Sequence, residues 1–311
     1  MRNFTIGVDV SKDFLDAGRL PDQEVQRFPN TEAGRTALLR WIGANADRVV
    51  FEPTGHYSKP LERALDAAGL PAVKVNPGRA RRFAEASGIL AKTDTIDALM
   101  LAAMGRQLCL EPRPAVSQAI EELKELEIAR RAYVKQRVAL RNRANRLALP
   151  VLTAQTEVIL AAIESAIEAI DAEIRAHVQA DPESARRADI LESIPGLSHI
   201  TAAVIIAEMP ELGDIDAKAA AALAGLAPIA RQSGKWKGRA AIRAGRAVLR
   251  QALYMPALVA ARFNPDLKRL YKRLREAGKP AKVALTAVMR KLIVLANTLI
   301  AQNRKWELKP A

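Results

Sequence analysis

The chain has 311 residues and a mass of 33.8 kDa, which is enough for about two domains at the usual ~100–200 residues each. Half of the residues are hydrophobic, so the chain can bury a sizeable core, and its single cysteine excludes a disulfide framework and any multi-cysteine zinc site. Lys and Arg number 48 against 34 Asp and Glu, and this net charge of +14 indicates a polyanionic partner, most simply nucleic acid.

The first 112 residues alternate between strand and helix patterns. Strands are predicted at residues 4–10, 14–18, 24–28, 48–51 and 72–75. Helices are predicted at residues 31–46, 60–68, 79–87 and 93–108. Three meandering strands followed by alternating helices and strands predict a mixed α/β domain over residues 1–112, with the third strand at an edge.

Two long helices are predicted after a linker at Pro112 and Pro114. Apolar residues recur every seven positions from Ala119 to Leu147, but the companion positions are only half apolar, so the coiled-coil stripe is imperfect. Isoleucines then line one face of a second helix that closes near residue 181. Residues 113–184 are therefore expected to form a helical arm, which would suit dimerisation.

Residues 185–311 predict a third, mostly helical domain of short helices separated by Gly and Pro. Residues 194–203 are similar to a helix-hairpin-helix, a turn that binds phosphate through its backbone, although Ser198 replaces the second hairpin glycine; an ordinary glycine-terminated helix would give the same pattern. Residues 284–301 are apolar but interrupted by Arg290, Lys291 and Asn297, so no membrane span is expected, and no signal-peptide core follows the first residues. We expect a cytoplasmic, nucleoid-associated protein.

Four acidic residues stand out in the first domain. Asp9 interrupts an apolar strand, Glu52 ends another, and Asp94 and Asp97 share one face at the start of a helix. Carboxylates from strand ends and a helix start can form an oxygen cage suited to Mg²⁺ or Mn²⁺, and two such ions would support phosphodiester cleavage. The alternative is that each acid only starts a turn, caps a helix or is solvated.

Two one-signed basic stretches form the second signal, because solvated helices normally mix both charges. No acid occurs between Ile128 and Thr156, or between Ala217 and Pro265. The guanidinium fork of arginine suits phosphate, so these stretches predict contact with nucleic acid. The residues expected to make this contact are Arg130, Arg137, Arg141, Arg143, Arg231, Lys235, Lys237, Arg239, Arg243 and Arg246.

Ser233 forms the third signal, because a glycine follows it and cations surround it. Backbone at Gly234 can approach a phosphate closely, although Ser-Gly by itself is most often only a turn. The sequence has no Gly-x-Ser-x-Gly elbow, no Walker A pattern and no His-Glu-x-x-His motif, which argues against conventional serine hydrolysis, nucleotide hydrolysis and zinc proteolysis.

These motifs, in this order, resemble the DEDD-type insertion-sequence transposases of the IS110 family, which are related to the Piv-like DNA invertases. The resemblance covers essentially the whole chain. The matching segments are residues 7–12 (GVDVSK), 51–55 (FEPTG), 76–77 (NP), 92–98 (KTDTIDA), 223–228 (LAGLAP), 232–234 (QSG) and 249–254 (LRQALY).

The resemblance implies a RuvC-like, RNase H-type N-terminal domain whose metal-binding tetrad is Asp9, Glu52, Asp94 and Asp97. It also implies that Ser233 is a nucleophile that forms a phosphoserine bond to DNA. The implied partners are DNA, a structured bridge RNA and further copies of the chain, with two protomers composing one active site. One departure is Ala244, where relatives often carry glycine, and its methyl group would narrow the approach of the backbone to DNA.

Two other interpretations fit the same residues. A junction-resolvase-like, metal-dependent nuclease would use the acids with water, and Ser233 would be only a turn. A non-enzymatic nucleic-acid binder would need the acids only for structure, so divalent metal would change nothing.

Overall fold

The structure is a computed structural model that describes residues 4–89, 93–112, 116–230, 232–234, 236–238 and 240–308. The side chain of Lys237 also lies outside this description. The chain divides into two compact units, Met1–Ala115 and Val116–Ala311, and each is considered by itself. The expected boundaries at 1–112, 113–184 and 185–311 stay a prediction, although the helical arm shares one unit with the C-terminal helices.

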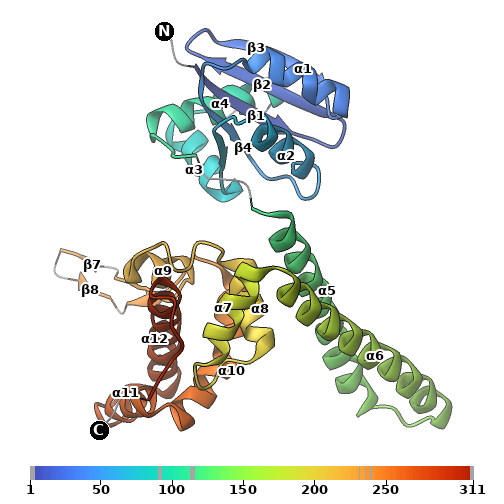
Figure 1. The fold of residues 1–311 in the computed structure, drawn as a ribbon, viewed down its shortest axis with the longest axis vertical. Helices are drawn as coiled ribbons and strands as arrows, with labels where there is room; N and C mark the ends of the chain where they lie inside the picture. Colours follow the sequence, from blue (N-terminus) through green and yellow to red (C-terminus); the bar gives the residue numbers. More distant parts are fainter. Residues whose placement is uncertain are drawn as a thin grey trace. The chain divides into compact units, whose positions relative to one another are not determined.

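The first unit is built on a mixed five-stranded sheet with the order β3-β2-β1-β4-β5 (Figure 1). Its strands are β1 (Phe4–Val10), β2 (Phe14–Leu20), β3 (Glu24–Pro29), β4 (Ala46–Phe51) and β5 (Ala72–Lys74). β1, β2 and β3 form an antiparallel meander, while β4 pairs in parallel with β1 and β5 in parallel with β4. The mixed α/β prediction and the edge position of the third strand are confirmed.

Helices pack on both faces of this sheet (Figure 1). They are α1 (Glu32–Ile42), α2 (Lys59–Ala67), α3 (Pro77–Ala86) and α4 (Asp94–Gln107). Ile6 and Val8 belong to a core cluster with residues of α1 and α2, whereas residues of α3 and α4 share a cluster with Val50. Because side chains alternate along a strand, Gly7 and Asp9 lie on the opposite face from Ile6 and Val8, which is the face that α4 covers.

The described part of the second unit is mostly helical, as predicted (Figure 1). Its helices are α5 (Gln118–Ala144), α6 (Pro150–Ala180), α7 (Pro182–Glu192), α8 (His199–Glu208), α9 (Ala217–Leu223), α10 (Ala247–Phe263), α11 (Pro265–Glu276) and α12 (Ala281–Ala301). Its strands are the short β6 (Pro228–Ile229), β7 (Gln232–Ser233), β8 (Trp236–Lys237) and β9 (Ala241–Ile242). The segment at residues 231–239 was predicted to be a loop. These four strands fall within or beside it, and each is only two residues long.

The two predicted long helices, α5 and α6, pack along each other and extend away from the other helices of this unit (Figure 1). At the base of this arm, Leu123 of α5 and Ile174 and Val178 of α6 are buried in the core that α8, α10 and α12 also form. Towards the tip the burial ends, and Val151 and Val158 are more than 60% exposed. The arm is thus anchored at one end only.

The predicted helix-hairpin-helix segment is a short turn between α7 and α8. The hydroxyl of Ser198 accepts a hydrogen bond from the backbone N–H of Thr201 and so caps α8. The departure from the hairpin pattern at this position therefore serves to begin the helix. Contact of this turn with phosphate stays a prediction.

Two helices, α6 and α12, are long and apolar enough to cross a membrane by length and composition alone. The expectation that residues 284–301 form no membrane span is not overturned, because the core helices of other proteins pass the same test. Burial inside the protein accounts for 56% of the apolar window of α12, as is usual for a core helix. Two such helices are weak evidence for a membrane span.

Candidate active site

The candidate site begins with a row of charged side chains across the sheet face that α4 covers. Asp9 of β1 lies directly opposite Asp16 of β2, and Asp16 lies directly opposite Arg27 of β3. Residues paired in this way point to the same face of a sheet. On the other side of β1, Val8 pairs with Phe51, so continuing that register by one residue places Glu52 beside Asp9.

Helix α4 brings two more carboxylates to this row. Gly7 lies on the same face as Asp9, and a Cβ atom there would overlap the carbonyl oxygen of Ala98 in α4. The missing side chain lets the helix lie directly on β1. Thr93 caps the helix by accepting a hydrogen bond from the backbone N–H of Ile96, and Asp94 and Asp97 occupy its first turn. The close approach at Gly7 therefore fixes where these acids stand.

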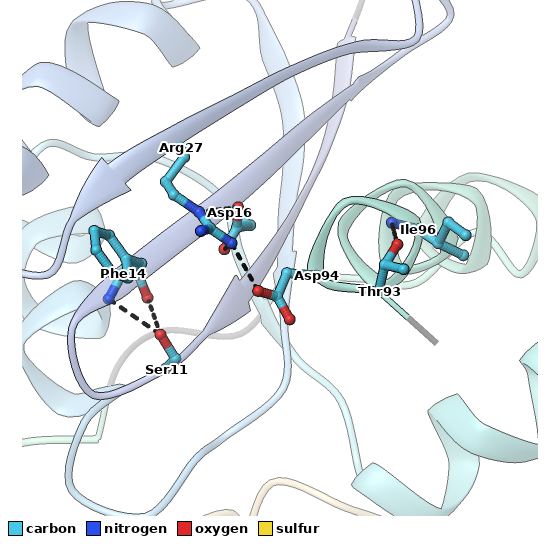
Figure 2. A network of polar contacts seen from close by, with 7 residues as sticks. All are labelled: Ser11, Phe14, Asp16, Arg27, Thr93, Asp94 and Ile96. Carbon is cyan, nitrogen blue, oxygen red and sulfur yellow. Dashed lines mark hydrogen bonds and ion pairs between the residues drawn. The ribbon is translucent and has the colours of Figure 1, made fainter. Parts of the chain in front are cut away.

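A single guanidinium joins the strand carboxylates to the helix carboxylates (Figure 2). Arg27 donates from Nε to Asp16 Oδ1 at 2.8 Å and from Nη2 to Asp16 Oδ2 at 3.1 Å. The same Nη2 donates to Asp94 Oδ2 at 2.7 Å. The side chain of Asp16 is only 6% exposed and that of Asp94 is 59% exposed, so the first contact is sheltered and the second faces solvent.

The acids act on one another electrostatically, as the pKa of Asp9 shows. Partial burial, followed by the negative charges of Asp97, Asp94, Asp16 and Glu52 in that order, together raise the pKa of Asp9 from its ordinary 3.8 to about 6. Glu52, Asp94 and Asp97 therefore all lie within electrostatic reach of Asp9. A neighbouring positive charge would relieve this repulsion.

The donor set fits a hard divalent cation, because every group in it is a carboxylate. Among the residues that the structure describes, however, no three His, Cys, Asp or Glu side chains are grouped to hold a metal ion as they stand. Asp94 is drawn instead towards Arg27 at the edge strand β3. The binding of a metal by Asp9, Glu52, Asp94 and Asp97 is therefore a proposal, taken up below.

Ser233 lies in the second unit on the two-residue strand β7. It pairs with Trp236 of β8, and both side chains are exposed, with Trp236 at 59%. Gly234 forms the turn of this hairpin with φ +54°, a conformation that favours glycine. Three of the predicted cations around the serine, Arg231, Lys235 and Arg239, lie outside the described residues, as does the side chain of Lys237.

Several of the remaining predicted phosphate ligands have protein partners. Arg130 binds both carboxylate oxygens of Asp171 on α6, an ion pair that raises the pKa of Arg130, and only a fifth of its side chain is exposed. Arg141 pairs with Glu164 of α6, and Arg246 pairs with Glu211 at 2.6 Å. Arg143 and Arg243 are exposed, while Arg137 is half-buried.

The sequence interpretation missed two residues of this site, Asp16 and Arg27. Asp16 carries the same signal that drew attention to Asp9, namely a carboxylate inside an apolar strand, and it is buried. The role of Arg27 could not be read from its own surroundings, because its partners are 11 and 67 residues away along the chain.

Comparison with known proteins agrees across both units. A DEDD-type IS110 transposase domain matches residues 6–149, and the transposase IS116/IS110/IS902 family matches residues 188–272. The pilin gene-inverting proteins of Moraxella bovis and Moraxella lacunata are each 28% identical over 97% of both chains. An uncharacterised 43.6 kDa protein of the insertion element IS110 of Streptomyces coelicolor is 29% identical over 48% of this chain and 36% of its own length.

The comparisons place this chain, with its carboxylate-lined sheet face and its arginine-rich helical unit, among DNA transposases and site-specific recombinases. The chain belongs to the IS110 family of transposases. Membership of a DEDD-type family implies dependence on a divalent metal.

Proposed function

We propose that this transposase cuts and rejoins DNA with a metal-binding tetrad, Asp9, Glu52, Asp94 and Asp97, and with Ser233 as the covalent nucleophile. The sheet order and the parallel pairing of β4 with β1 support a RuvC-like, RNase H-type fold for the first unit. The single observation that carries the proposal is that Glu52, which follows β4, and Asp94 and Asp97 in the first turn of α4 all act electrostatically on Asp9 of β1.

The tetrad would hold one or two Mg²⁺ or Mn²⁺ ions, which would stabilise the negative charge on the scissile phosphate when bound. The protein's own contribution is to place the carboxylates. Asp9 and Glu52 come from neighbouring parallel strands, and Asp97 is fixed on α4 by the close contact at Gly7.

Ser233 would attack the phosphorus atom through Oγ. The Oγ–P bond forms as one P–O bond of the DNA backbone breaks, and the serine proton ends on the departing hydroxyl. One phosphodiester replaces another, so the step needs no nucleotide cofactor. Reversal by a hydroxyl of a second DNA strand rejoins the backbone and restores the serine. The exposed hairpin supports this role, because Ser233 can reach an external phosphate without moving a packed helix.

The metal assignment is tested by Asp97→Asn, with Asp66→Asn on the exposed face of α2 as the control. The full-length variant should still bind DNA in a gel-shift assay. Its rate of DNA cleavage in Mg²⁺ should fall by ~10³-fold, an effect typical of removing a group that stabilises charge in the transition state. Cleavage by Asp97→Asn at the rate of the control would contradict the tetrad.

The serine assignment is tested by trapping the protein on a cleaved DNA substrate and mapping the attachment by mass spectrometry. Wild type and the exposed control Ser165→Ala should carry DNA on Ser233, whereas Ser233→Ala should give no adduct although it binds DNA. An adduct on another residue, or strand transfer by Ser233→Ala at the original rate, would favour the metal-dependent nuclease.

We further propose that the active form is a homo-oligomer guided by a structured RNA, in which two protomers contribute to each active site. Mixing inactive Asp97→Asn with inactive Ser233→Ala should then restore strand transfer, because one protomer supplies the acids and the other the serine. Failure of every mixture would place both groups in one protomer. The tagged protein, purified from its native host, should protect one defined sequence of the copurified RNA from ribonuclease. Recovery of random RNA fragments alone would contradict guidance by a structured RNA.

A further inference from the structure

Arg27 has no role in the proposed chemistry, yet it contacts one of the four proposed metal ligands (Figure 2). Two groups other than Asp94 hold its guanidinium in place. Asp16 accepts both arms of the fork, and the guanidinium carbon lies 5.0 Å from the centroid of the Phe14 ring. Because Asp16 is buried, moving Arg27 away would leave an uncompensated charge in the sheet.

The contact of Arg27 with Asp94 is weaker than its contact with Asp16. Asp94 offers one oxygen to a guanidinium nitrogen that Asp16 already uses, and its side chain is 59% exposed. An exposed ion pair of this kind is readily exchanged for another partner. A competing cation would therefore remove Asp94 from Arg27 rather than remove Arg27 from Asp16.

We propose that Arg27 is an internal counter-ion of the acidic site, which holds Asp94 in the metal-free enzyme and releases it when a divalent cation binds. Asp94 moves between the two positive charges, and Arg27 stays on Asp16 and Phe14. The inference rests on the proposed metal tetrad and adds to it a positioning residue on β3.

The test measures Mn²⁺ affinity of the full-length protein without DNA, from the electron paramagnetic resonance signal of free Mn²⁺. The informative variant is Arg27→Gln combined with Asp16→Asn, because it keeps two polar side chains in contact, keeps their summed charge at zero, and leaves Asp94 without its cation. We expect Mn²⁺ to bind about fivefold tighter, the factor that an exposed ion pair of this strength sets. Equal or weaker binding by the double variant would overturn the proposal.

The matched control is Arg19→Gln with Glu24→Gln, which removes an ion pair between the same two strands at the other end of their pairing. A role of Arg27 in sheet stability alone would lower the melting temperature in both double variants and leave both Mn²⁺ affinities unchanged. If wild type itself binds no Mn²⁺, or if Asp97→Asn binds it as well as wild type does, the proposed tetrad fails and not only the counter-ion.

A second measurement does not depend on the double variant folding. In ¹⁵N spectra of the arginine side chains of wild type, with the Arg27 signals assigned through Arg27→Lys, adding Mg²⁺ should shift the Nη signals and leave the Nε signal in place, since Nε donates to Asp16 only. Unchanged Nη signals at saturating Mg²⁺ would overturn the proposal.

Discussion

The two units of this transposase place opposite charges on opposite kinds of scaffold. The first gathers carboxylates on the face of a sheet, where strand register and a helix packed on Gly7 determine the position of each one. The second carries its arginines on long helices and its serine on a hairpin of two-residue strands, where few contacts determine position. The groups proposed to hold a small ion thus stand on paired strands and a closely packed helix, whereas the serine proposed to meet DNA stands on a hairpin with fewer contacts.

The largest expected effect is the salt dependence of DNA binding, which the second unit should dominate. If the basic helices neutralise about six phosphates, affinity should fall by roughly 10³-fold between 50 and 200 mM salt. Arg137→Gln with Arg143→Gln should reduce the logarithmic salt slope by about two, because each phosphate that an arginine neutralises contributes ~0.9 to that slope.

The control for this measurement is Arg130→Gln. Because Asp171 holds both arms of Arg130, this variant should lose stability while the salt slope stays that of wild type. A salt slope near zero for wild type would mean that the positive charge of the helices serves another purpose than binding phosphate.

The next effect tests the rigidity of the first unit. Gly7→Ala places a methyl group against the carbonyl oxygen of Ala98, so α4 must move off the sheet. We expect a loss of more than about 3 kcal/mol in the free energy of unfolding of this unit, measured by urea denaturation. The control Gly78→Ala lies in α3, where the nearest atom, Asn76 Oδ1, is 3.3 Å from the new methyl group and belongs to a side chain that can move, so stability should change by no more than about 1 kcal/mol. Equal stability of the two variants would show that α4 does not rest on β1.

A buried carboxyl at the base of the arm gives a pH dependence to the second unit. Glu127 of α5 is 2% exposed and neither of its oxygens has a hydrogen-bond partner. Burial raises its pKa most, the cations Arg130 and Arg131 oppose this rise, and the charges of Asp171 and Glu208 add to it, so that the pKa rises overall from 4.5 to about 7. The folded protein therefore keeps a proton that the unfolded chain releases, so stability falls as pH rises from about 4.5 to about 7.

Glu127→Gln should remove that slope, because glutamine stays neutral. At pH 8 the variant should be more stable than wild type by up to about 3 kcal/mol, and at pH 4 the two should agree. The measurement is urea unfolding of both proteins between pH 4 and 8, with the exposed Glu157→Gln as control. A slope that persists in Glu127→Gln would assign it to another group.

Most elements of the fold could be predicted from the sequence, because the spacing of apolar residues and the residues that begin or end helices and strands depend only on neighbours along the chain. Thr93 sits at a helix start where it was expected, and the β-rich segments placed the first three strands. Pro150 was expected to end the first long helix, but that helix already ends at Ala144 and Pro150 begins the next one. Asp9 was identifiable because burying a carboxylate inside an apolar strand costs free energy unless the carboxylate is paired, hydrogen-bonded or bound to a metal. These features need no knowledge of what lies across the fold.

The pairing of charges could not be predicted in the same way. Whether Arg130 faces DNA or Asp171 depends on how α5 and α6 align, and their paired residues are 41 positions apart. The contacts of Arg27 with Asp16 and Asp94 depend on strand register and on the position of α4, neither of which can be read from the sequence around Arg27. A stretch of sequence with basic residues and no acids therefore suggests more positive charge for binding DNA than the folded protein offers, since acids of the neighbouring helix neutralise part of it.

The smallest expected effect on stability concerns Ala244, which follows β9 in the second unit. Its φ is +62°, a conformation that costs an alanine more than a glycine, and its side chain is exposed, so no packing compensates. Ala244→Gly should therefore raise the free energy of unfolding of the second unit by about 1 kcal/mol in urea denaturation. In contrast, Ala241→Gly within β9 should lower it by about 0.5 kcal/mol, because glycine weakens an extended strand. A loss of stability in Ala244→Gly would mean that the left-handed turn does not form in solution, and the serine hairpin would then have a different base.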